Sequence, residues 1–124
     1  MERIITIDGQ QVPFKATGSS LRRYRFKFGR DLLQDFSKLV TEVQGIQKRN
    51  KGKLALESLS PETLTTFEQM AYIFAQQADE TIPSDPDEWL DRFSMFSIYV
   101  VLPEIIELWN ISNMPTAEQK KKQE

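Results

Sequence analysis

A repeating stripe of apolar residues in the first half of the chain most constrains its fold. Successive members lie three or four residues apart, which is the period of one face of an α-helix. The stripe consists of Leu21, Tyr24, Phe28, Leu32, Phe36, Leu39 and Val43. Ser19 or Ser20, just before it, suits the N-cap of a helix. The pattern predicts a long amphipathic helix over about residues 20–43, in which Gly29 marks a kink or a close backbone approach.

The residues before this helix predict a β-hairpin over residues 3–16. Residues 3–7 are rich in β-branched side chains, and Asp8-Gly9 follows as a hairpin turn because glycine tolerates a positive φ. In the returning segment Pro13 cannot donate a ladder hydrogen bond, so this strand belongs at an edge. An isolated hairpin is marginal in water, and we therefore expect it to pack on the helices or on a neighbouring copy.

Two proline-marked helix starts follow in the second half. Ser60 suits an N-cap and Pro61 the first helical position, which predicts a helix over about residues 61–79. Asp85 and the proline after it give the same signal for a helix over about residues 86–96.

The very apolar segment 97–109 predicts a last helix, which Pro103 either kinks or restarts. After it the chain becomes polar, and residues 113–124 are expected to form a mobile, disordered tail. A length of 124 residues suits one domain. The sequence thus predicts a single α+β domain over residues 1–112, mainly α-helical, in which an N-terminal β-hairpin packs with about four helices.

The composition argues against several classes of function. The chain contains no cysteine and no histidine, which excludes disulfides, thiolate zinc sites and a Ser-His-Asp arrangement. No apolar run approaches the roughly 20 residues needed to span a bilayer. We therefore expect a cytoplasmic interaction protein that is not an enzyme, with no cofactor, no metal site and no membrane partner.

Charge is distributed unevenly along the chain. Residues 1–56 carry 12 basic and five acidic side chains, whereas residues 57–124 carry four basic and 13 acidic ones. Three interpretations are open: the halves pair within one fold, copies stack head to tail, or the basic half binds nucleic acid. The residues predicted to pair charges, within the fold or between subunits, are Arg22, Arg23, Arg25, Lys27, Arg30, Asp87, Glu88 and Asp91.

Nucleic-acid binding is the least favoured of these three interpretations. Aromatic residues interleave with the basic cluster, as they do in proteins that stack on bases. Tyr24 and Phe28, however, fall on the apolar stripe, where they cannot reach a base.

A second group of aromatic residues is the candidate partner-binding surface. Aromatic side chains at this spacing are most often core, and any part left exposed would favour a partner. The residues are Trp89, Phe93, Phe96, Tyr99 and Trp109.

An ordered series of segments resembles the tail assembly chaperones of phages and prophages of Gram-positive bacteria. The resemblance covers roughly residues 3–112, and no single motif in it is chemically diagnostic. The segments that carry it are residues 14–33, 67–75, 88–93, 96–99 and 102–109.

The resemblance implies a small, mainly helical α+β protein of a long-tailed phage in the host bacterial cytoplasm. Such chaperones coat the tape measure protein, keep it soluble, help to recruit tail tube protein, commonly self-associate and are absent from the mature virion. The family has no catalytic residue, and Lys120-Lys121-Lys122 falls where its members often shift translational reading frame. The alternative function is a nucleic-acid-binding or regulatory phage protein that uses the basic helix Arg22–Arg30.

Overall fold

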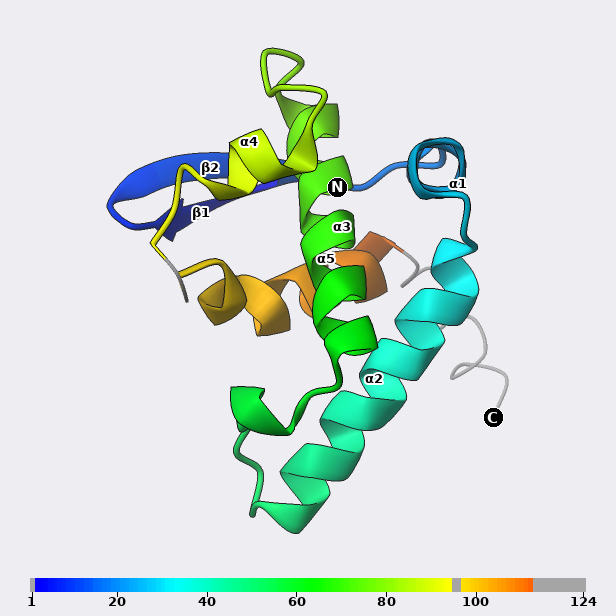
Figure 1. Ribbon diagram of the computed structural model, residues 1–124, viewed down its shortest axis with the longest axis vertical. Coiled ribbons are helices and arrows are strands. Elements are labelled where there is room, and N and C mark those ends of the chain that lie inside the picture. Colours follow the sequence, from blue (N-terminus) through cyan, green and yellow to red (C-terminus); the bar gives the residue numbers. More distant parts are fainter. Residues whose placement is uncertain (1, 95–96, 113–124) are drawn as a thin grey trace.

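The computed structural model describes residues 2–94 and 97–112 (Figure 1). In them a two-stranded antiparallel hairpin precedes five α-helices and two short 3₁₀ helices, so the predicted α+β, mainly helical fold is confirmed. The elements are β1 (Glu2–Ile7), β2 (Gln10–Lys15), α1 (Ser20–Phe28), α2 (Leu32–Arg49), η1 (Leu56–Ser58), α3 (Pro61–Ala78), α4 (Pro86–Leu90), η2 (Ser97–Val101) and α5 (Leu102–Ser112). The predicted tail, residues 113–124, lies outside the described residues.

The β-hairpin forms where the sequence predicts it. Asp8 and Gly9 both have positive φ, 53° and 75°, as a two-residue hairpin turn requires. One face of the hairpin is apolar and buried, through Ile5, Ile7, Val12 and Phe14. The hairpin packs on helices of its own chain, mainly through contact of β2 with α3.

The prediction of one helix over residues 20–43 is wrong at both its middle and its end. Gly29 adopts a left-handed conformation, with φ 71°, and its N–H donates to the Arg25 carbonyl at 2.8 Å, so α1 ends there. The Asp31 side chain then accepts from the Leu33 N–H at 2.9 Å and starts α2. The second helix runs on to Arg49, because buried Ile46 continues the apolar stripe.

Helix α3 is the centre of the fold. Ser60 caps it by accepting from the Thr63 N–H at 3.2 Å, and it ends at Ala78, close to the predicted boundary. Residues 70–75 are all buried, which means that neighbours surround this part of the helix. It contacts β2, α1, α2, α4 and α5 (Figure 1).

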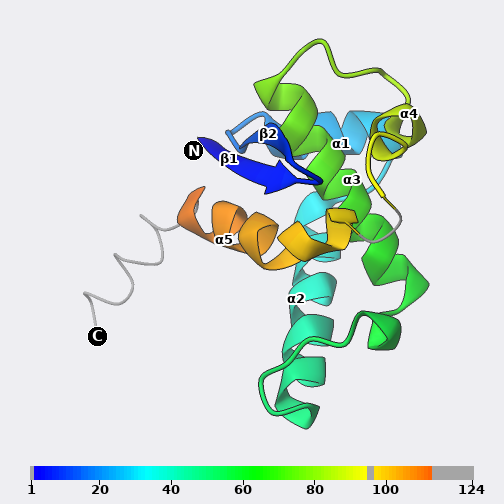
Figure 2. The same cartoon turned by 90° about the vertical axis from the view of Figure 1, so that its left-hand side faces the viewer.

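The last third of the chain is more broken than predicted. Asp85 caps α4 as expected, but the helix ends at Leu90 instead of residue 96. The predicted helix over residues 97–109 consists of η2 followed by α5, which extends to Ser112. Pro103 is the second residue of α5, where no intrahelical donor is needed, so the proline restarts the chain as a new helix. In Figure 2, α5 lies below the β-hairpin and above most of α2.

The carboxylate of Asp8 connects the tip of the β-hairpin to Ser94 and Ser97, between α4 and α5. Asp8 accepts hydrogen bonds from the Ser94 N–H at 2.6 Å, from the Ser94 hydroxyl at 2.8 Å and from the Ser97 hydroxyl. The bonds from Ser97 and Ser94 hold the pKa of Asp8 below its ordinary value. The first turn of the molecule is therefore tied to residues far along the chain.

Candidate functional site

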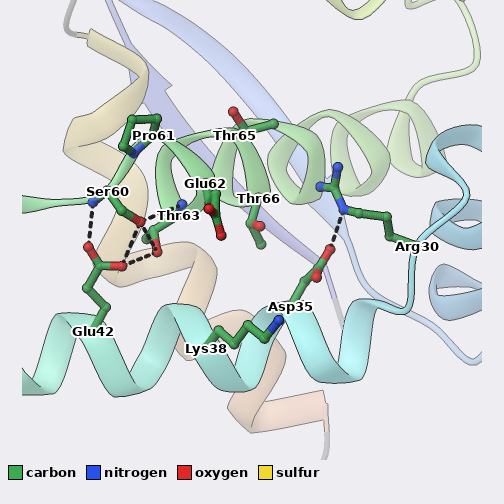
Figure 3. Close-up of a pocket in the computed structure, with 10 residues that line it drawn as sticks. All are labelled: Arg30, Asp35, Lys38, Glu42, Ser60, Pro61, Glu62, Thr63, Thr65 and Thr66. Atoms are coloured by element: carbon green, nitrogen blue, oxygen red, sulfur yellow. Dashed lines mark hydrogen bonds and ion pairs between the residues drawn. The ribbon is translucent and has the colours of Figure 1, made fainter.

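Two of the hollows beside α2 lie on opposite sides of the helix, and the larger of the two is called the polar groove because charged and hydroxyl side chains form most of its lining. It lies between α2 and the first turns of α3, with a volume of about 640 Å³ (Figure 3). Asp35, Lys38 and Glu42 line it from α2, at the spacing of one helix face. The opposite wall carries the hydroxyl side chains at the start of α3.

Glu42 closes one end of this polar groove. Its carboxylate accepts hydrogen bonds from the Ser60 hydroxyl at 2.9 Å, from the Ser60 N–H and from the Thr63 hydroxyl (Figure 3). Desolvation is the largest influence on the pKa of Glu42 and raises it, but the hydrogen bonds from Thr63 and Ser60 outweigh it and the pKa lies below its ordinary value. The anion position at the start of α3 is thus filled by the chain itself.

Arg30 and Asp35 occupy the other end of the polar groove. Arg30 Nε donates to Asp35 Oδ2 at 2.8 Å, and the Tyr24 hydroxyl donates to the same oxygen at 2.8 Å. Arg30 Nη2 also donates to the Tyr24 hydroxyl at 2.9 Å. Burial, followed by the hydrogen bond to Asp35, raises the pKa of Tyr24 to about 12. This network holds the junction of α1 and α2 in place.

These contacts give the polar groove a structural role. Its two most enclosed carboxylates, Asp35 and Glu42, both accept hydrogen bonds that join one helix to another. Residues 2–94 and 97–112 contain no group of three or more side chains able to hold a metal ion. That the chain is not an enzyme and binds no cofactor stays a prediction.

The smaller groove is apolar and lies between α2 and α5. It has a volume of about 220 Å³. Val40, Leu54 and Ile106 line it and are half-buried, so apolar surface on them remains open to solvent. Gln44 and Gln47 also line it, and no charged side chain of the described residues does. The sequence prediction missed this groove, although Val40 stands beside the apolar stripe of α2.

Of the predicted partner-binding aromatics, the structure packs Trp89 and Phe93 against each other. Trp89 is only 1% exposed and packs edge-on against Phe14 at a centroid distance of 6.3 Å, so its assignment to a partner surface is wrong: it is a core residue. Phe93 is half-buried with its ring 5.3 Å from Trp89. Phe96 lies outside the described residues.

Tyr99 and Trp109 lie on other parts of the molecule. The Tyr99 ring is 5.9 Å from Phe67 and its hydroxyl donates to Glu68, so that burial, then this bond, raises its pKa to about 12. The Trp109 ring is 4.9 Å from Phe36. Both are half-buried and complete the packing around α3.

The predicted charge-pairing residues do not pair with one another among the described residues. Arg30 pairs with Asp35, and the Lys27 ammonium donates to the Ser84 carbonyl. Asp87, Glu88 and Asp91 are exposed on α4 and just after it. Of the ion pairs found within the described parts of the chain, that between Arg3 and Glu107, at 3.3 Å, joins the basic half to the acidic half.

Arg22, Arg23 and Arg25 remain exposed on α1, the helix that also carries an exposed aromatic ring. The ring is that of Phe26, which is 74% exposed, and the Arg22 guanidinium carbon lies 5.2 Å from its centroid. Its place off the apolar stripe is the sequence signal for this exposure.

Comparison of this chain with family models, curated proteins and solved structures gives no match. Among the described helices, none combines the length and the apolar character needed to cross a membrane.

Proposed function

We propose that this chain is a tail assembly chaperone of a long-tailed phage or prophage, which binds the tape measure protein and keeps it soluble. The observation that carries the proposal is the apolar groove between α2 and α5. The resemblance of residues 3–112 to this family supports it from the sequence side.

The groove suits a helical client. An amphipathic helix is recognised by inserting apolar side chains, spaced three or four residues apart, into an apolar groove. Val40 and Ile106 offer partly open apolar surface from two different helices. A volume of about 220 Å³ takes one or two such side chains, so each contact is weak and a long client needs many copies. Weak, repeated contacts also let tail tube protein displace the chaperone.

The remaining elements of the proposal follow the family. The chaperone self-associates along its client, helps to recruit tail tube subunits in the host bacterial cytoplasm and is absent from the mature virion. Exposed apolar stripes on a bare tape measure protein would aggregate, which is the need that such a protein meets.

Nucleic-acid binding is the second candidate, and exposed Phe26 is the observation that favours it. A base can stack on this ring while Arg22, Arg23 and Arg25 neutralise phosphates. Helix α1 presents these groups on one short convex surface, whereas single-strand binders track the backbone along a charged groove. The chaperone function is therefore preferred.

Coexpression with the tape measure protein of the same genome tests the proposal. The wild-type chain should raise the soluble yield of the client, and Val40→Lys, which places a charge across the groove, should abolish the gain. Thr41→Lys is the matched control, because Thr41 is the exposed neighbour on the same helix. Unchanged client solubility with the wild-type chain, or equal effects of the two variants, would contradict the proposal.

A further inference from the structure

The exposed Phe26 has a complementary cavity on another part of the same molecule. This cavity has a volume of about 280 Å³. Phe28, Pro86 and Leu90 give it an apolar wall, and Asp85 and Asp87 stand beside them. Since a cavity of about 150 Å³ holds benzene, this one is large enough to admit a phenylalanine ring, beside a lining that also includes Thr65 and Gln69. We call it the α4 pocket.

The charges around the two features are opposite. Phe26 is flanked by the exposed side chains of Arg22, Arg23 and Arg25. The residues that line the α4 pocket include Glu68, which accepts from the Tyr99 hydroxyl, Asp85, which caps α4, and Asp87. Two cations lie close to the pocket: Lys27 donates to the Ser84 carbonyl, and Arg30, which is paired with Asp35, donates to Gln69 of the pocket lining. The pocket is therefore predominantly acidic and is complementary to an aromatic ring on a helix that carries exposed arginines.

A molecule cannot fill its own pocket with its own Phe26. Phe28, which lines the pocket, is two residues further along α1, and side chains two residues apart on a helix point to roughly opposite sides. Phe26 thus faces away from the pocket, and the occupant must be supplied by another molecule.

We infer that Phe26 of one copy inserts into the α4 pocket of a second copy. The contact joins different surfaces of the two copies, so it is heterologous, and its repetition gives a ring or an open spiral. The inference rests on the proposed function, because a chaperone of a long client needs to form a repeated array along it. In this contact the basic helix α1 of one copy binds the α4 pocket of the next. Phe26 of the first copy then meets Pro86 and Leu90 of the second.

Sedimentation velocity on the purified chain alone tests the contact over a range of protein concentrations. The wild-type chain should associate, and both Phe26→Ala and Asp87→Arg should weaken association by at least about 10-fold, as loss of a buried aromatic anchor or a reversed charge does. Val100→Ala is the matched control, because Val100 is also strongly exposed, at 72%, but lies on neither surface. It should associate as the wild type does.

Mixing the two defective variants gives the sharper result. Phe26→Ala keeps an intact pocket and Asp87→Arg keeps an intact Phe26, so the mixture should form a heterodimer and nothing larger. Circular dichroism checks that both variants are folded. A wild-type chain that stays monomeric at every concentration, a Phe26→Ala chain that associates normally, or a mixture that stays monomeric would overturn the inference.

The same variants test whether the surface around Phe26 binds nucleic acid instead of a second copy. Fluorescence anisotropy with a labelled oligo-dT should show no binding that depends on Phe26; salt-sensitive binding lost in Phe26→Ala would assign the surface to nucleic acid and overturn the contact between copies. Since no client is present in these experiments, failure here leaves the coexpression result standing, and failure of coexpression leaves this contact standing.

Discussion

The polar and apolar grooves on either side of α2 differ in whether their side chains already form contacts within the fold. In the polar groove Glu42 and Asp35 accept hydrogen bonds from α3 and from the α1–α2 junction, so this surface largely holds the fold together. In the apolar groove Val40 and Ile106 are half-buried and bounded by glutamines. The larger groove is therefore the one whose side chains hold the fold together, and the smaller one leaves apolar surface open to solvent.

A substitution on the buried face of α2, between the two grooves, should have the largest effect on the free energy of unfolding. Leu39→Ala should lower the free energy of unfolding by about 2–5 kcal/mol, because Leu39 is 1% exposed and its removal leaves a cavity. Leu33→Ala makes the same chemical change on the same helix at a site that is 54% exposed, and should cost less than about 0.5 kcal/mol. Urea denaturation measures both; similar losses would show that the core face is misplaced.

Removal of Glu42 should have the next largest effect on stability. Glu42→Ala leaves the Ser60 N–H and two hydroxyls without their acceptor, and we expect a loss of about 1–2 kcal/mol. Glu62→Ala is the control, since Glu62 lines the same groove but is exposed. If both variants unfold at the same denaturant concentration, the polar groove does not have the structural role assigned to it.

Acid should weaken the polar contacts in a defined direction. The pKa of Glu42 is lower in the folded chain than its ordinary value, so its contribution is present above about pH 4.3 and is lost as the pH falls through the folded pKa. Asp8 and Asp79 shift in the same direction. Thermal unfolding between pH 7 and pH 3 should therefore show a decline below about pH 4.5, and Glu42→Gln should make it shallower. A decline of equal steepness in the variant would contradict the assignment.

The smallest effect on stability is expected in the apolar groove. Val40→Thr keeps the shape of the side chain and adds a half-exposed hydroxyl, so the free energy of unfolding should change by less than about 1 kcal/mol. Client affinity should still fall, by about 2- to 30-fold, because burying an unpaired hydroxyl costs about 0.5–2 kcal/mol. Unfolding and client-binding titrations on the same sample separate the two effects. Unchanged client affinity would show that the apolar groove does not bind the client.

Local signals in the sequence predicted the helix starts well. Ser60 and Asp85 each cap a helix through their own side chain, and each is followed by a proline, so the signal lies within a few residues. The break at Gly29 carried a similar local signal, a glycine followed two residues later by a capping aspartate. The sequence analysis placed a kink or a close backbone approach at Gly29 but kept one helix, because the apolar stripe keeps its spacing across the break and periodicity alone does not register a change of helix axis.

The sites were less predictable, because they depend on contacts between distant residues. Trp89 was assigned to a surface since aromatic spacing cannot tell an exposed ring from one that Phe14 covers. The place of Phe26 off the apolar stripe signals its exposure, but the pocket at Pro86 becomes visible only when α1 and α4 are both packed against α3. The link between Glu42 and Ser60 likewise needs α2 and α3 to be packed together.

The fastening of Asp8 to Ser94 has a consequence for the order in which the molecule folds. The hydrogen-bonded residues are 86 positions apart, and a contact between such distant positions forms late because a large loop must first be closed. During synthesis the hairpin emerges before α3 and the segment after α4, so its docking site is incomplete at that stage. We expect the amides of α2 and α3 to gain protection before those of β1 and β2 when hydrogen exchange is followed during refolding, and the reverse order would contradict this sequence of events. The N-terminal strands would then act as the closing element of the fold, added to a helical assembly that has already formed.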